Sequence, residues 1–256
     1  MNQKQDYIAV FDSGVGGISV LRQLRRRMPK ERYLYFGDSA NAPYGSRTTE
    51  EIRALALNTA AHLMEKGIKA LVVACNTATA AAIDALRSTY PQMIVVGIEP
   101  ALKLAAQKFP GGNVGVLATP VTLREEKFQK LVNSSSIHCE VIKLPAPGLA
   151  DLVEAGKADS PEAVALLEPL LSPWAGKLDA LVLGCTHYPF AAASIRAIMG
   201  ENLPLLDGGE GTARETQRRL AEKDLLSDGP GELVWENSSQ DAAMVNLCRT
   251  LLEDLE

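Results

Sequence analysis

One short segment of this chain occurs twice. Residues 69–77 read Lys-Ala-Leu-Val-Val-Ala-Cys-Asn-Thr, and residues 179–187 read Asp-Ala-Leu-Val-Leu-Gly-Cys-Thr-His. Each copy is a continuous apolar run that ends in a small residue and a cysteine and then turns polar, which predicts a strand buried on both faces. Cys75 and Cys185 are therefore expected in equivalent places, each just beyond the end of a buried strand.

Apolar runs alternate with helical patterns along the chain, which predicts an α/β protein with two lobes and mainly parallel sheets. The expected strands lie at 7–11, 33–36, 70–74, 93–97, 114–118, 139–144, 180–184, 203–206 and 233–235. The expected helices lie at 17–28, 49–66, 78–88, 101–108, 121–132, 191–199, 212–223 and 241–253. Crossing points at 99–100 and 207–209 give a first lobe of residues 1–98 plus 207–256 and a second of 99–206.

The composition excludes several classes of protein. The 256 residues are 46% apolar and 22% charged, as in ordinary globular proteins, and the net charge of -5 argues against a nucleic-acid binder. No apolar stretch reaches the ~18 residues of a membrane span. The polar residues 1–7 contain neither a signal peptide nor a targeting helix, so we expect a cytoplasmic protein with free thiols.

Polar clusters follow four of the expected strands, at the strand ends where α/β sheets bind their ligands. They lie at 12–17, at 37–39 running on to 43–46, at 75–77 and at 185–189. They offer hydroxyls, amides and backbone N–H groups at helix starts, which suit an anionic small molecule.

Two equivalent thiols at such a site suggest proton transfer. A helix N-terminus lowers a thiol pKa from ~8.5 into the range ~3.5 to 7.5, so one of Cys75 and Cys185 is expected as thiolate while the other stays protonated. The thiolate would take the α-proton of an amino acid from one face, and the thiol would return a proton to the other. Asp12 and His187 are candidate general bases or orienting partners.

Several of these residues also have ordinary structural interpretations. Cysteine is often simply buried, and we assign Cys139, on an expected strand, and Cys248, on the apolar side of the last helix, to the core. A Cys/Cys/His metal site matches no zinc spacing, so no metal is expected. His62 and His138 have no polar cluster around them and receive no role.

The glycine-rich turn at 14–17 invites a nucleotide interpretation, but the third glycine of the dinucleotide fingerprint and a Walker lysine are both missing. No cofactor is therefore expected. Asp12 and Ser13 could be helix N-caps, a role compatible with facing a ligand.

Two rival functions are a cysteine hydrolase built on Cys185 and His187, and a carboxylate-binding protein with two lobes. The hydrolase needs one nucleophilic cysteine and leaves Cys75 unexplained. The binding protein needs neither thiol. Most proteins of that kind are exported, and the lack of a signal peptide argues against this function.

The motifs resemble those of the cofactor-independent glutamate racemases, over nearly the whole chain and in the expected order. The matching stretches are Asp12-Ser-Gly-Val-Gly-Gly17, Pro43-Tyr-Gly45, Cys75-Asn-Thr-Ala78 and Gly184-Cys-Thr-His-Tyr-Pro189. The last stretch separates this group from the related aspartate racemases. The resemblance implies two pseudo-symmetric lobes with glutamate in the cleft between them, and D-glutamate supplied to peptidoglycan synthesis.

By this resemblance Cys75 and Cys185 are the proton donor and acceptor pair, and Glu154 is a carboxylate near the site. It implies substrate contacts from Asp12, Ser13, Tyr44, Gly45, Asn76, Thr77, Thr186 and His187. The choice of glutamate over another acidic amino acid such as aspartate rests on the resemblance alone. A homodimer is a further expectation, since dimers are common in the family.

The sequence departs from the family pattern in three places. Thr79 stands where serine is frequent, and Asp207-Gly-Gly209 replaces a more usual Asp-Ser-Gly, which removes a hydroxyl from that loop. The segment before Ile8 is short, so we expect activity that does not depend on a cell-wall precursor.

Overall fold

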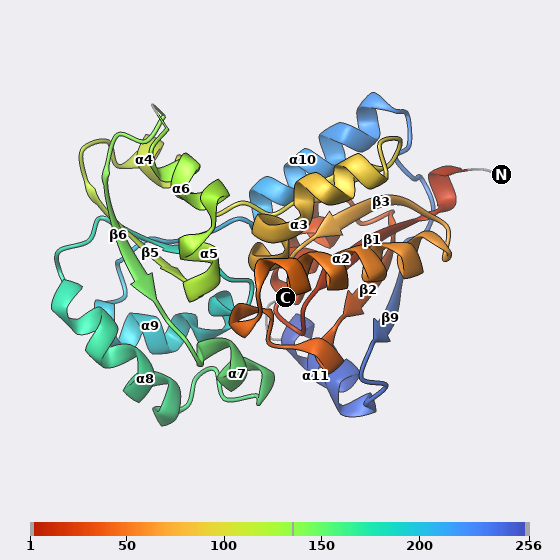
Figure 1. Ribbon diagram of the computed structural model, residues 1–256. Coiled ribbons are helices and arrows are strands. Elements are labelled where there is room, and N and C mark those ends of the chain that lie inside the picture. The colour runs from red at the N-terminus through yellow and green to blue at the C-terminus, as the bar shows by residue number, and fades with distance from the viewer. Residues whose placement is uncertain (1–2, 135, 254–256) are drawn as a thin grey trace. The chain divides into compact units, whose positions relative to one another are not determined.

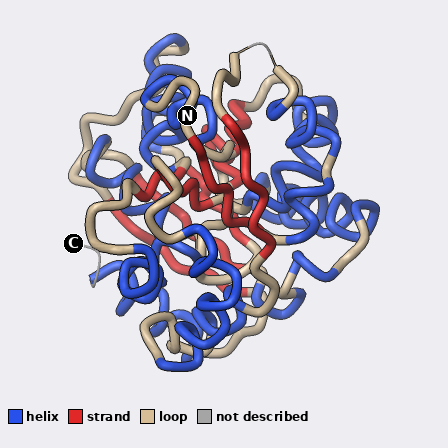
Figure 2. The backbone as a smooth tube through the Cα atoms, turned by 90° about the vertical axis from the view of Figure 1, so that its left-hand side faces the viewer, coloured by secondary structure: helices blue, strands red, loops and turns tan. Residues whose placement is uncertain are grey.

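In the computed structural model, residues 3–134 and 136–253 are described, so the first two residues of the polar N-terminal segment lie outside the described part. Helices and strands alternate along the chain, as the tube in Figure 2 shows. The chain divides into two compact units: Glu99–Gly208 form one, and the described residues on either side of that segment form the other. The lobe boundaries expected from the sequence, at 98/99 and 206/207, stay a prediction.

The first unit is built on a five-stranded parallel sheet. Its strand order is β4-β3-β1-β2-β9. The bounds are β1 Tyr7–Asp12, β2 Arg32–Gly37, β3 Ile68–Val73, β4 Ile94–Gly97 and β9 Glu232–Asn237. β1 and β3 are almost wholly buried, as the continuous apolar runs predict for central strands. All neighbouring strands are parallel, so their carboxyl ends meet at one edge.

Helices cover both faces of this sheet. They are α1 Ile18–Arg27, α2 Thr49–Met64, α3 Asn76–Thr89, α10 Gly209–Glu222 and α11 Ala242–Glu253, with short 3-10 helices η1 Gln3–Gln5, η2 Ser39–Asn41 and η3 Tyr44–Ser46. α2 packs beside α3 (Figure 1), and α1 packs against α10 and α11. A capping box between Thr48 and Glu51 starts α2, which explains its sharp beginning.

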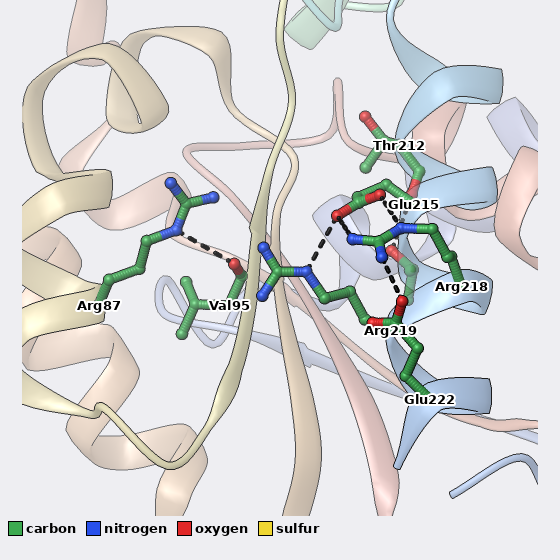
Figure 3. Close-up of polar contacts among 8 residues, drawn as sticks. Arg87, Val95, Thr212, Glu215, Arg218, Arg219 and Glu222 are labelled. Carbon is green, nitrogen blue, oxygen red and sulfur yellow. Dashed lines mark hydrogen bonds and ion pairs between the residues drawn. The ribbon is translucent and has the colours of Figure 1, made fainter. Parts of the chain in front are cut away.

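Ion pairs on α10 and an arginine of α3 lie near the open edge strand β4 (Figure 3). Arg218 pairs with both Glu215 and Glu222, one turn to either side of it. Arg87 donates from its Nε to the carbonyl of Val95, 3.4 Å away. A charged side chain on an outward carbonyl makes an edge strand less available for pairing with another strand.

A buried ion pair joins distant segments at the amino-terminal ends of the strands. The Lys69 Nζ lies 2.6 Å from the Glu31 Oε2, and both side chains are 1% exposed. Lys69 also donates to the carbonyls of Lys4 and Leu225, and Glu31 accepts the backbone N–H of Ser227. Because buried charges need several partners, these bonds tie the start of the chain and the segment before β9 to the sheet.

The second unit contains a four-stranded parallel sheet with the order β6-β5-β7-β8. Its strands are β5 Asn113–Ala118, β6 Glu140–Pro145, β7 Ala180–Leu183 and β8 Leu205–Asp207. The helices are α4 Leu102–Lys108, α5 Pro120–Arg124, α6 Glu126–Val132, α7 Leu149–Glu154, α8 Pro161–Leu171 and α9 Ala192–Met199, with η4 Ser172–Trp174 and η5 Tyr188–Ala191. Separate apolar clusters fill the two faces, one under α7, α8 and α9 and one under α4, α5 and α6.

The structure corrects three expectations about these elements. The single helix expected at 121–132 is two helices, because the backbone at Glu125 is extended in ψ and breaks the hydrogen-bond ladder. α7 and α8 were not expected. Cys139 is half-buried and precedes β6 instead of lying on it, although it does pack against a core cluster, whereas Cys248 is 2% exposed in α11, as expected. None of the described helices is long and apolar enough to cross a bilayer.

Candidate active site

The loop after β1 carries Asp12 and Ser13, both buried. The Asp12 Oδ1 accepts the backbone N–H of Gly14 at 2.9 Å, so the carboxylate folds back on its own loop. It does not cap α1, whose N-cap is Gly17 without a side-chain cap bond. A Cβ on Gly17 would lie 2.6 Å from the Asp12 Cβ, so only glycine allows the loop to pass this close. The N-cap interpretation of Asp12 is therefore wrong.

Cys75 lies at the N-cap of α3, two residues beyond β3. Its sulfur accepts the backbone N–H of Ala78 at 3.4 Å, and its thiol lies 3.5 Å from the Ser13 hydroxyl. The side chain is buried, and the N–H groups and dipole of a helix start favour negative charge there. Parallel register brings the loops after β1 and β3 to one edge, which explains the contact between Ser13 and Cys75.

Asn76 is the first residue of α3 and is only 5% exposed. Neither its amide oxygen nor its amide nitrogen has a hydrogen-bond partner among the described residues. A buried amide without partners costs about 1–3 kcal/mol. A polar ligand at the start of α3 would supply the missing bonds, and Thr77, which follows, is buried there as well.

Tyr44 lies in η3, which contacts α3, and its side chain is buried. Its hydroxyl donates to the Asp38 Oδ2 at 2.6 Å, and the Asn41 amide donates to both oxygens of the same carboxylate. Burial raises the pKa of Tyr44, and the Asp38 carboxylate and the nearby Cys75 raise it further, so Tyr44 stays a neutral donor. Gly45 beside it is half-buried.

Asp38 lies in the polar cluster expected at 37–39, but it was not among the residues expected to contact the substrate. The available signal was its position directly after β2, at the edge where β1 and β3 also end.

In the second unit, Cys185 follows β7 and is 8% exposed. Its sulfur lies 3.7 Å from the His187 Nδ1, and the His187 Nε2 lies 2.6 Å from the Glu154 Oε1 at the end of α7. Tyr188 fixes this turn by donating to the Ala146 carbonyl at 2.9 Å. Thr186, which lies between Cys185 and His187 in the sequence, is buried as well. The structure thus joins Cys185, His187 and Glu154 into one connected row.

The charge state of His187 follows from this row. Burial lowers the pKa of His187, but the hydrogen bonds to Cys185 and Glu154 and their negative charges outweigh that effect, so the pKa lies well above its ordinary value. A protonated His187 between the two groups would stabilise negative charge on the Cys185 sulfur.

The predicted residues fall into two groups, each at the carboxyl edge of one sheet. The first unit holds Asp12, Ser13, Tyr44, Gly45, Cys75, Asn76 and Thr77. The second holds Glu154, Cys185, Thr186 and His187. Among the described residues, no three His, Cys, Asp or Glu side chains gather in a way that could hold a metal ion.

A match to the Asp/Glu/Hydantoin racemase family model covers residues 17–216. The chain belongs to this family. It is accordingly a racemase, an isomerase by reaction class. The glutamate racemase of Clostridium botulinum is 43% identical over 256 residues, which are 99% of each chain.

Two solved structures give the same picture for the fold. The glutamate racemase of Thermus thermophilus, in complex with beta-chloro-D-alanine, is 35% identical with a TM-score of 0.82, covering 97% of this chain and 93% of that one. The Escherichia coli glutamate racemase, in complex with L-glutamate and the activator UDP-MurNAc-ala, is 28% identical with a TM-score of 0.84, covering 98% and 95%. Two parallel α/β regions are therefore the fold of this racemase.

Proposed function

We propose that this racemase interconverts L- and D-glutamate and that Cys75 and Cys185 transfer the proton. The observation that carries the proposal is the pair of buried thiols, each just beyond a central parallel strand and each beside its own polar partner, Ser13 or His187. The names of the relatives support glutamate as the substrate.

The proposed reaction transfers two protons, one from the substrate and one to it, and leaves no net change in the enzyme's charge. A thiolate sulfur takes the α-proton of glutamate and becomes a thiol, while the electron pair of the broken C–H bond stays on the α-carbon. The other thiol then gives its proton to the opposite face and becomes a thiolate. The pair ends with its protonation states exchanged, ready for the reverse direction.

The groups around each thiol have proposed roles in this scheme. His187, held by Glu154, assists Cys185, and Asp12 with Ser13 assists Cys75. Asn76, Thr77 and the N-terminal N–H groups of α3 are suited to a carboxylate of the substrate, and the unpartnered amide of Asn76 supports that assignment most directly. Tyr44, Gly45 and Thr186 are proposed as further substrate contacts.

The proposed role in the cell is to supply D-glutamate for peptidoglycan synthesis, and so for cell wall biogenesis and cell shape, in the cytoplasm. A homodimer stays a prediction.

One experiment tests the function. The purified protein is incubated in D2O with each glutamate enantiomer, and optical rotation and α-proton exchange are followed together. Racemisation with deuterium in the product is expected from both enantiomers, with aspartate as the matched comparison substrate. Turnover of aspartate in preference to glutamate would contradict the substrate assignment, and no exchange from either would contradict the reaction.

The row of Cys185, His187 and Glu154 also fits a cysteine hydrolase, since the imidazole touches the sulfur with one nitrogen and a carboxylate with the other. Family membership counts against it. A Cys75→Ser variant separates the two functions, because a hydrolase would keep full activity and the racemase would lose it.

A further inference from the structure

Tyr35 lies near the carboxyl end of β2 and is 1% exposed. Its hydroxyl donates a hydrogen bond to the carbonyl of Gly14, 2.7 Å away. Gly14 belongs to the loop after β1, and its N–H is the one that the Asp12 carboxylate accepts. Gly14 is thus hydrogen-bonded on both sides: its N–H donates to Asp12 and its carbonyl accepts from Tyr35. These two bonds hold the loop that carries Asp12 and Ser13.

Close packing leaves this loop little freedom to find another position. A Cβ on Gly17 would lie 3.1 Å from the Tyr35 hydroxyl and 3.2 Å from the Ala74 Cβ, and a Cβ on Gly37 would lie 2.8 Å from the Gly14 oxygen. A side chain at either glycine would collide with these atoms, so the loop, the Tyr35 hydroxyl and Ala74 are closely packed together.

The aromatic ring of Tyr35 is itself supported from the neighbouring strand. Tyr35 pairs in register with Trp235 of β9, and their ring centroids lie 5.7 Å apart in an edge arrangement. The Arg249 guanidinium of α11 lies 5.9 Å from the Trp235 ring centroid. Edge-on aromatic pairs of this kind have a defined geometry, so the ring and its hydroxyl are held in one place.

The loop in turn sets the environment of a reactive thiol. Ser13 directly precedes Gly14 in the chain, and its hydroxyl lies 3.5 Å from the Cys75 sulfur. A shift of the Gly14 carbonyl would therefore move Ser13 relative to Cys75. Displacement of a reacting group by about 1 Å costs on the order of a hundredfold in rate.

We propose that Tyr35 is a positioning residue that fixes the loop of Asp12 and Ser13 against Cys75 through its bond to the Gly14 carbonyl. This inference rests on the proposed function for its kinetic consequence. Its structural consequence is that the loop of Ser13 stays packed against Cys75, and this applies to the protein without substrate.

The chain offers a matched control on the same strand. Tyr33 is also buried, two residues earlier on the same face of β2, and its hydroxyl donates at 2.9 Å to the carbonyls of Leu24 and Met28 at the far end of α1. Tyr33→Phe therefore removes a buried hydroxyl of the same kind without touching the loop of Asp12.

The test compares Tyr35→Phe with Tyr33→Phe. In Tyr35→Phe, kcat for glutamate should fall about tenfold while KM stays within about twofold, because the proposed contacts of Asn76, Thr77 and Tyr44 remain while Ser13 is misplaced relative to the Cys75 thiol. Alkylation of Cys75 by iodoacetamide, followed by peptide mass spectrometry across pH, should rise about threefold as the loop loosens, with Cys185 unchanged as an internal reference. Tyr33→Phe should leave kcat and the alkylation of Cys75 within about twofold of the parent. This should hold even where its melting temperature falls as much as that of Tyr35→Phe.

If Tyr35→Phe and Tyr33→Phe have the same kcat and the same rate of Cys75 alkylation, the positioning role of Tyr35 is wrong. Failure of the parent protein to racemise glutamate would instead overturn the proposed function, and the alkylation comparison would then decide the positioning role by itself.

Discussion

Cys75 and Cys185 follow two similar apolar runs in the sequence, yet their surroundings differ. Cys75 is followed at once by a helix, so its sulfur receives the helix N-terminus and a neutral serine hydroxyl. Cys185 is followed by a turn and the short η5, and its sulfur faces an imidazole that is bonded to a carboxylate. The repeated strand sets the position of each sulfur, while the residues that follow each cysteine and partners from other segments, Ser13 and Glu154, set its electrostatics.

The difference matters because, in the proposed mechanism, both thiols must donate and accept a proton. A helix start stabilises a thiolate by fixed backbone dipoles, which do not titrate. A protonated imidazole stabilises it by a full charge that depends on pH. The two faces of the substrate are therefore expected to respond differently to substitution and to pH.

The largest expected effect comes from removing either sulfur. Cys75→Ser and Cys185→Ser should each slow racemisation by about 10³-fold or more, because a hydroxyl is a far poorer base than a thiolate. Elimination from a glutamate analogue with a β-leaving group needs abstraction only. By the family pattern, Cys75→Ser should keep elimination from the L-form and Cys185→Ser from the D-form. Elimination from the same enantiomer by both variants would refute the assignment of one thiol to each face.

A smaller effect is expected from Glu154→Gln, which removes the carboxylate behind His187. Abstraction from the L-form should slow by about 10²-fold, since the imidazole is no longer held and charged. Elimination rates from the two enantiomers measure this directly. Glu168→Gln on α8, an exposed glutamate, is the control and should match the parent. Equal slowing of both enantiomers would contradict a role confined to Cys185.

The same variant tests the pH dependence of stability. The pKa of His187 is raised in the folded protein, so its protonation contributes stability fully below the unfolded value of ~6.5 and loses that contribution as pH rises through the folded pKa. The melting temperature of the parent should exceed that of Glu154→Gln most near pH 6, and the gap should narrow toward pH 10. A gap that widens with pH would contradict a raised pKa.

Ser13→Ala should have a smaller effect on the Cys75 side, about threefold on abstraction from the D-form, because a neutral hydroxyl contributes less than a charged partner. Elimination rates from the two enantiomers of the analogue with a β-leaving group measure the asymmetry. Ser88→Ala, at the exposed end of α3, is the control. An effect larger than that of Glu154→Gln would reverse the proposed contrast between the two thiols.

No effect on either side is expected from removing metals or trapping carbonyl groups. In the proposed mechanism the two thiols supply acid and base themselves, so dialysis against a chelator, with hydroxylamine added, should leave the rate unchanged. A loss of activity that added metal or pyridoxal phosphate restores would contradict the proposal.

The sequence predicted the strands well because buried parallel strands are continuous apolar runs. Each expected strand overlaps one of β1 to β9, and the two duplicated runs are β3 and β7. The helix α8 was missed although it has clear signals: Ser160 caps it, Pro161 is its first residue, and Ala163, Leu167 and Leu171 are buried at helical spacing. α7, with six residues, is too short to show a period.

The site could be predicted only as far as local sequence determines it. The loops of Asp12, Cys75 and Cys185 follow strands, and strand ends are visible in the sequence. The bond from Glu154 to His187 and the bonds of Asp38 and Tyr35 join segments far apart in the chain, so only the fold brings them together. For Glu154 the family resemblance supplied what spacing alone could not.

The strand order of the first unit has a consequence for synthesis on the ribosome. β9 pairs with β2, yet about two hundred residues separate their sequences, and all four strands of the second sheet lie between them. The second unit is contiguous, so its strands have all emerged while β2 still has an open edge. Growing chains should therefore gain protease resistance first in residues 99–208, and a chaperone that binds open strand edges would find one at β2 until β9 emerges.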